Sequence, residues 1–117
     1  MPLSITTRVE NEIAILDLEG ALTLGPTLRA LREITLEILN QRRPTGLIIQ
    51  LANVTTADSA GLGELTVVYT YSSKRGCRLA LAGVNSNLRT MLEITRLDGL
   101  LPVAEDLKSA KTLVSHR

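Results

Sequence analysis

One short run of apolar residues in the middle of the chain constrains the fold most. Leu47-Ile48-Ile49-Gln50-Leu51 follows Gly46 and is broken only by one glutamine. Such a run is typical of a strand buried on both faces, as in a parallel sheet covered by helices. Segments with helical spacing lie on both sides of it. The pattern therefore predicts an α/β domain whose central strands are parallel and joined by right-handed helical crossovers.

The segment before this strand repeats apolar residues at steps of three and four, which predicts a helix. Gly25-Pro26 is expected to open it, because proline suits a first helical turn. Gln41-Arg42-Arg43-Pro44 is expected to close it, because cations suit a helix C-terminus and proline cannot continue the helix. The residues expected on its buried face are Leu24, Leu28, Leu31, Ile34 and Ile38.

A polar stretch, residues 53–59, follows the central strand, and a second helix is expected from about Ala60 to Arg75. Its predicted inward stripe is Leu62, Leu65 and Tyr69. Val67 and Tyr71 lie on another face of this helix. They either pack under a neighbouring helix or line a partner surface, and packing is the favoured interpretation because scattered apolar residues are ordinary on surfaces.

The rest of the chain completes the same pattern. Residues 3–20 predict a hairpin that turns at Asn11-Glu12, and Cys77 to Ala82 predict another strand. Asn85 or Ser86 can cap a third helix, a short strand is expected within 101–104, and Asp106 can cap a last helix. The residues expected on the apolar faces of these two helices are Leu88, Met91, Leu92, Thr95, Leu107, Ala110, Leu113 and Val114. The order ββαβαβαβα describes one α/β domain over residues 1–117, with a mixed sheet and about four helices.

Composition excludes several classes of protein to which the chain could belong. The 117 residues are 44% hydrophobic, enough for a core and too apolar for a disordered regulator. A formal charge of +1 and 2% aromatic residues give no footprint for nucleic acid or for an anionic membrane. The first residues lack the pattern of a signal peptide, and no apolar stretch approaches bilayer length. A cytoplasmic protein that does not insert into membranes is expected.

Catalytic patterns are weak. Cys77 and His116 have no partners at metal-ligand spacing, so neither a metal nor a cofactor is expected. His116 is read as a solvated tail residue. Gly61 and Gly63 complete no phosphate-binding motif and are read as allowing close backbone approach. The carboxylates are read as scattered charges rather than an acid–base pair: Asp17, Glu19, Asp58 and Glu64. No catalytic residue is assigned, and the protein is expected not to be an enzyme.

Asp58-Ser59 lies where the second helix should begin, at the rim of the sheet where parallel strands end. Elementary physics favours helix capping there, because Asp and Ser are preferred N-cap residues. The same position also suits a phosphorylation switch. A phosphate adds about −1.5 to −2 charge, which the helix N-terminus tolerates and a docked partner would not.

Asp58-Ser59-Ala60-Gly61-Leu62-Gly63 resembles the Asp-Ser-Ser/Thr-Gly-Leu-Gly signature of the STAS domains of anti-sigma factor antagonists. Residues 47–54 resemble the strand that precedes that signature, and Gly20-Ala21-Leu22-Thr23 resembles the family's Gly-Glu-Leu-Asp loop. The resemblance extends from about Leu3 to Val114. It implies a non-enzymatic partner-switching regulator of transcription.

The resemblance also implies partners and a site. The unmodified protein would bind an anti-sigma factor that is a serine kinase of the GHKL type, phosphorylation of Ser59 would release it, and a PP2C-type phosphatase would reset the cycle. Partner contacts would come from Leu22, Thr23, Leu24, Gly25, Asp58, Ser59, Ala60, Gly61, Leu62 and Gly63. Ala60 replaces the family's second hydroxyl, which leaves Ser59 as the sole candidate acceptor in the motif. Ala21 and Thr23 replace the usual acids, which leaves a different partner open.

Three alternatives remain. STAS domains also serve as scaffolds of stress-signalling complexes and as accessory subunits of lipid or anion transporters. A remote alternative is a small serine hydrolase that uses Ser59, although the sequence from Ala57 to Gly61 lacks the glycine of a nucleophile elbow. The sequence also leaves open whether the protein forms a homodimer.

Overall fold

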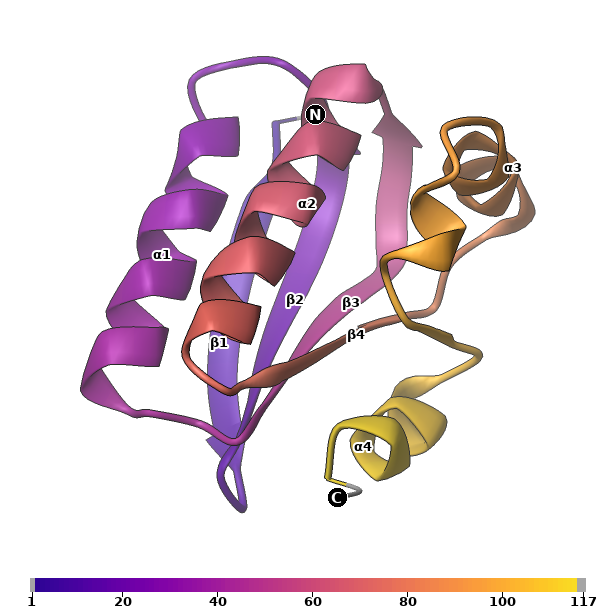
Figure 1. Ribbon diagram of the computed structural model, residues 1–117. Coiled ribbons are helices and arrows are strands. Elements are labelled where there is room, and N and C mark those ends of the chain that lie inside the picture. Colours follow the sequence, from indigo (N-terminus) through magenta and orange to yellow (C-terminus); the bar gives the residue numbers. More distant parts are fainter. Residues whose placement is uncertain (1, 116–117) are drawn as a thin grey trace.

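A five-stranded mixed sheet with helices on both faces forms the protein in a computed structural model that describes residues 2–115 (Figure 1). The strands lie in the order β1-β2-β3-β4-β5; β1 and β2 are antiparallel and the other pairs are parallel. The strands are β1 Ser4–Glu10, β2 Ile13–Leu22, β3 Gly46–Ala57, β4 Arg78–Ala82 and β5 Val103–Ala104. The helices are α1 Leu28–Gln41, α2 Ser59–Lys74, α3 Ser86–Ile94 and α4 Leu107–Ser115, with a 3-10 turn at Leu97–Gly99.

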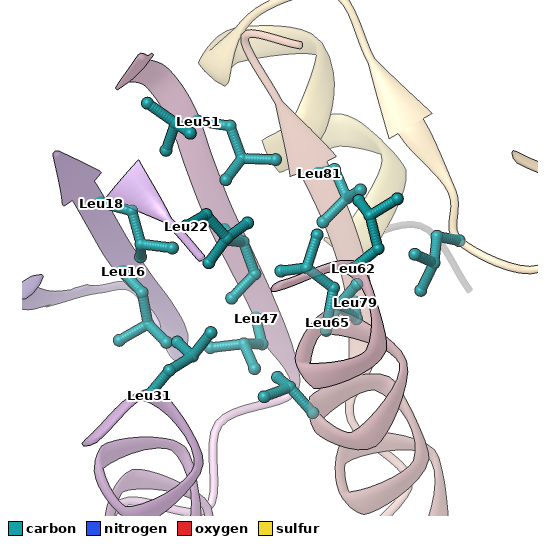
Figure 2. Packing of buried hydrophobic residues seen from close by; sticks show 14 of the residues in the cluster. Leu16, Leu18, Leu22, Leu31, Leu47, Leu51, Leu62, Leu65, Leu79 and Leu81 are labelled. Atoms are coloured by element: carbon teal, nitrogen blue, oxygen red, sulfur yellow. The ribbon is translucent and has the colours of Figure 1, made fainter. Parts of the chain in front are cut away.

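The main core lies between the sheet and the pair α1 and α2, which run side by side across one face (Figure 1). Leucines from both layers interdigitate there (Figure 2). Leu31 of α1 and Leu65 of α2 are fully buried against strand residues such as Leu16 and Leu47. Burying each such side chain contributes about 1.5–3 kcal/mol. The helices are therefore held firmly on the strands that lead into them.

The opposite face of the sheet carries a second, smaller core beneath α4. Ile15 and Ile48 alternate with the residues of the main core, and they pack with Ala110 and Val114 of α4. Val114 lies so close to Gly46 that a Cβ at this glycine would meet the valine side chain at 2.6 Å. Both faces of the central strands are covered, as the apolar run at residues 47–51 predicts.

The predicted element order and fold class are confirmed, and the hairpin turn at Asn11-Glu12 is formed by two residues with positive φ. Asn85 and Asp106 accept hydrogen bonds from the first turns of α3 and α4, as predicted for caps. β3 extends through most of the polar stretch 53–59, as far as Ala57, because this segment pairs with the end of β2; Val54 is buried there between exposed neighbours.

Three predictions about helix faces are wrong. α1 begins at Leu28, so Leu24 lies in the preceding loop and is 78% exposed. Leu113 of α4 is 43% exposed, and Thr95 caps the C-terminus of α3 on the surface. Tyr71 packs against the main core, which confirms the packing interpretation for this residue. None of the helices in residues 2–115 has the length and apolar character needed to cross a membrane.

Candidate functional site

Asp58 joins the start of α2 to the loop that follows β2. It is the N-cap of α2, and its Oδ1 accepts a hydrogen bond of 2.9 Å from the backbone N–H of Gly61. Its Oδ2 accepts a second one, of 3.0 Å, from the backbone N–H of Leu24. These hydrogen bonds, that of Leu24 first and that of Gly61 next, lower the pKa of the Asp58 carboxyl. The carboxylate therefore stays ionised at neutral pH and fixes two chain segments together.

Ser59 is the first residue of α2 and is exposed. The strand β3 ends at Ala57, so the serine lies at the carboxyl rim of the parallel strands (Figure 1). This is the edge at which open α/β sheets place their ligands and partners. A hydroxyl in this position is accessible to another protein, and the free end of the helix dipole favours negative charge beside it. The serine is not itself the cap, because Asp58 fulfils that function.

Gly61 allows the helix to start against the end of β2. A Cβ at this position would collide with the carbonyl oxygen of Leu22, which also accepts a hydrogen bond of 3.2 Å from the Asp58 N–H. The interpretation of the two signature glycines as points of close backbone approach is therefore right for Gly61. It is wrong for Gly63, which is exposed and where a Cβ would meet nothing within 4 Å.

Three residues expected to contact a partner are buried instead. The side chains of Leu22 and Leu62 are 0% and 1% exposed, and Gly61 is buried against Leu22. They support the rim from below and offer no side chain to another protein, so the expectation of direct contact is corrected for these three. The remaining seven residues are exposed or half-buried and are called the tip surface: Thr23, Leu24, Gly25, Asp58, Ser59, Ala60 and Gly63.

Leu24 is the most exposed large apolar residue of the tip surface. Its side chain is 78% exposed although its backbone N–H is bound to Asp58. The loop is thus held in place while its leucine projects into solvent. Solvent-exposed apolar side chains held on a rigid backbone favour protein docking, because burial gains apolar area without ordering the loop first. The tip surface therefore combines an apolar contact with an accessible hydroxyl.

An ion pair that the sequence analysis missed braces the helices beneath the tip surface. Arg32 of α1 holds Glu64 of α2 through two contacts, Nε to Oε2 at 3.1 Å and Nη2 to Oε1 at 2.6 Å. Glu64 was interpreted as a scattered surface charge, but its side chain is only 12% exposed. The sequence did hold a signal for this ion pair: one predicted helix carries a basic residue, and the next carries an acidic residue near its start.

Cys77 and Asp17 lie away from the tip surface. Cys77 is buried, and burial raises the pKa of its thiol to about 11, so it is protonated and shielded. Asp17 interacts with Arg8 on the sheet, at 3.6 Å, far along β2 from the tip surface. No group of three His, Cys, Asp or Glu residues within 2–115 is arranged to hold a metal ion. His116, the sole histidine, lies outside the described residues.

Solved structures of similar shape come from regulators and from a transporter family. An anti-sigma factor antagonist from Mycobacterium paratuberculosis is 21% identical over 97% of this chain and 95% of its own, with a TM-score of 0.84. A sulfate transporter family protein from Wolinella succinogenes is 22% identical over 92% of this chain and 88% of its own, with a TM-score of 0.77. The anti-sigma factor antagonist SpoIIAA, in its unphosphorylated form, is 15% identical over 99% of this chain and 100% of its own, with a TM-score of 0.70.

At these identities the likeness establishes the fold. Among curated proteins, no sequence matches the chain. The model of the STAS domain family matches residues 4–110, which covers every strand, both helices of the main core and the tip surface. The resemblance found in the residues around Asp58-Ser59 is thereby confirmed, and this chain belongs to the STAS domain family.

Proposed function

We propose that the protein is an anti-sigma factor antagonist that regulates transcription by partner switching. In its unmodified form it binds an anti-sigma factor that is also a serine kinase of the GHKL type. Phosphorylation of Ser59 ends this complex, and a phosphatase of the PP2C type restores it. The protein itself catalyses nothing. The observation that carries the proposal is the exposed position of Ser59 as the first residue of α2, directly after an ionised Asp58.

Electrostatics explains how one phosphate would switch the complex. A docked partner covers the tip surface, with exposed Leu24 as its apolar contact. Phosphorylation adds about −1.5 to −2 charge next to the Asp58 carboxylate. The partner would then have to bury an unpaired dianion beside a second negative charge. A loss of about 3 kcal/mol corresponds to an affinity more than a hundredfold weaker.

The fold itself would tolerate the modification. The phosphate would lie at a helix N-terminus, where backbone N–H groups and the helix dipole favour an anion. The leucines beneath the rim are fully buried and would not be disturbed. The protein would therefore change its partner without changing its structure.

Affinity measurements with tip-surface variants test this function. The probe is an anti-sigma kinase of the GHKL type, and binding is measured by calorimetry. Ser59→Ala should bind like the unmodified protein, and Ser59→Asp should bind roughly a hundredfold more weakly. Ser73→Asp is the matched control, because Ser73 is exposed near the other end of the same helix. Equal losses for both aspartate variants, or no loss for either, would contradict the proposal.

A second function within the same family is favoured by the similarity to the sulfate transporter family protein. There the domain would act as an accessory subunit of an anion transporter, or as a scaffold of a signalling complex, and Ser59 would be part of a fixed contact. Two results together would favour this function. Neither the unmodified protein nor Ser59→Asp would bind the kinase, and Ser59→Asp would bind a transporter subunit.

A further inference from the structure

We propose that the end of the molecule opposite the tip surface is a second docking surface, which binds an acidic segment of a partner protein. Five exposed cations form this surface, called the basic end: Arg42, Arg43, Lys74, Arg75 and Arg78. The proposal goes beyond partner switching at Ser59, because it involves neither that residue nor its modification. The net charge of +1 conceals this cluster, since five of the 13 Lys and Arg residues gather at one end.

The topology brings these residues together. In the parallel sheet, Gly46 at the start of β3 is in register with Arg78 at the start of β4. α1 and α2 both end beside these strand starts, at Gln41 and Lys74 (Figure 1). Because β3 runs from Gly46 to Ala57, the basic end and the tip surface lie at opposite ends of the same strand. Two partners could therefore bind at the same time.

A groove between the two helix ends organises part of the basic end. It has a volume of about 540 Å³, and its lining includes Arg43, Arg75 and Asn40. Arg75 is held in position, since its Nε donates a hydrogen bond of 3.0 Å to Asn40 Oδ1 and its guanidinium lies 5.9 Å from the ring centroid of Tyr71. Its Nη1 also donates a hydrogen bond of 3.2 Å to the backbone oxygen of Tyr71, which leaves Nη2 as the nitrogen of the guanidinium without a partner among the described residues. The N–H groups of Nη2 can donate to a carboxylate.

Helix capping does not account for so much positive charge. The C-termini of α1 and α2 together carry the equivalent of about one negative charge. Within residues 2–115, none of the five cations is ion-paired with a carboxylate. Two acids line hollows next to these cations: Glu12 shares one with Arg78, and Glu37 shares another with Arg42. Most of the charge of the basic end is therefore available to another molecule.

The backbone of Arg43 adopts a conformation that is unusual for an arginine. Its φ is +47°, in the left-handed region that glycine adopts without strain. It follows the C-cap residue Arg42, the position at which helices usually carry glycine. An arginine here costs stability, and its side chain lines the groove without forming an intramolecular ion pair among the described residues. Three other residues, Asn11, Glu12 and Arg96, also have a positive φ, so the conformation alone does not mark a site; at Arg43 the strained residue also lines the groove.

The chemistry of the surface favours an acidic protein segment over other anions. The chain has only two aromatic rings, and both pack against the main core: Tyr71 lies under Arg75, and Tyr69 lines the hollow beside Arg78. A run of nucleic-acid bases therefore has few rings to stack on. The surface is also indented, with further hollows of about 400 and 470 Å³ on either side of Arg78. A peptide chain can follow such hollows, whereas a bilayer cannot.

Fluorescence anisotropy with a labelled peptide of alternating glutamate and serine tests the proposal. The full chain should bind this peptide at low salt, and binding should weaken as salt is added. The double variant Arg43→Glu, Arg75→Glu should lose at least about tenfold in affinity, equivalent to about 1.4 kcal/mol. The control Arg29→Glu, Arg89→Glu changes the net charge equally at exposed positions outside the basic end and should bind within about twofold.

A further variant separates binding from folding. Arg43→Gly relieves the left-handed backbone, so its melting temperature should rise by a few degrees while its affinity for the peptide falls. Absence of peptide binding, or equal losses in both double variants, would overturn the proposal. So would tighter binding of phosphatidylserine–phosphatidylcholine vesicles or of a single-stranded oligonucleotide at the same arginines. Ser59→Asp should bind the peptide normally, so failure at the basic end is distinguishable from failure of the switch.

Discussion

The carboxylate of Asp58 accepts a hydrogen bond of 3.0 Å from the backbone N–H of Leu24, 34 residues earlier in the chain. The bond links the loop after β2 to the first turn of α2, so the exposed leucine and Ser59 are presented together. The helix cap and the docking surface therefore depend on one side chain. Each oxygen of the carboxylate has its own partner, Gly61 in the helix cap and Leu24 in the loop. The two contributions of Asp58 can therefore be measured separately.

Removal of the Asp58 carboxylate should cost more than the loss of a helix cap. Asp106→Ala is the matched control, because Asp106 caps α4 through the N–H of Ser109, at 2.8 Å, without a bond to a distant loop. Asp106→Ala should lose about 1 kcal/mol of unfolding free energy in urea. Asp58→Ala should lose more, and amide exchange at Leu24 should accelerate only in this variant. Unchanged exchange at Leu24 would show that the bond does not hold the loop.

Stability should fall in acid, in part through Asp58. Its hydrogen bonds lower its pKa in the folded state below that in the unfolded state. The unfolded chain therefore binds the proton more readily, so this contribution is complete above about pH 4 and is lost as the pH falls through the folded-state pKa. Urea denaturation at pH 7 and at lower pH measures the slope. Asp58→Asn should flatten it, and an unchanged slope would show that Asp58 contributes nothing.

The two glycines of the signature should respond to alanine in opposite directions. Gly61→Ala forces a methyl group against the carbonyl oxygen of Leu22 and should destabilise the protein by about 1–3 kcal/mol. Gly63→Ala adds a methyl group in open space on a helix and should stabilise it by about 0.5–1 kcal/mol. Urea denaturation of both variants measures the difference. Similar changes of the same sign would contradict the close approach of β2 and α2.

Leu24 should matter to the partner and not to the fold. It is 78% exposed, so Leu24→Ala should change the unfolding free energy by less than about 0.5 kcal/mol. Its affinity for the anti-sigma kinase should nevertheless fall, by about tenfold if the side chain is buried in the complex. Ile94→Ala is the matched control, because Ile94 is 76% exposed at the end of α3. If both variants bind equally well, Leu24 is not a contact.

Periodicity predicted the order of strands and helices because burial on one or two faces leaves a pattern in the sequence. Prediction from periodicity failed where the same residue pattern is compatible with two kinds of local structure. Leu24 stands four residues before Leu28 and so matched the helical repeat, although it lies in a loop. Residues 53–57 are mostly polar and show no strand pattern, yet they pair with the end of β2, a partner distant in the sequence.

The candidate site was predicted as a segment but not as a surface. The position of Ser59 followed from the strand and helix that flank it. The burial of Leu22 and Leu62 did not, because it depends on how β2 approaches α2 across Gly61. The ion pair of Arg32 with Glu64 and the hydrogen bond of Asp58 to Leu24 likewise join residues more than 30 positions apart. The sequence shows that opposite charges occur on the two helices, but it does not show which residues meet in the folded chain.

The intact mass of the protein after incubation with the anti-sigma kinase and ATP tests the central claim most directly. The exposed serine at the start of α2 should accept one phosphate, and the mass gain should be absent from Ser59→Ala. Circular dichroism of the modified protein should match that of the unmodified one, since the phosphate lies at a helix N-terminus. No mass gain, or a gain that persists in Ser59→Ala, would contradict a switch at this residue.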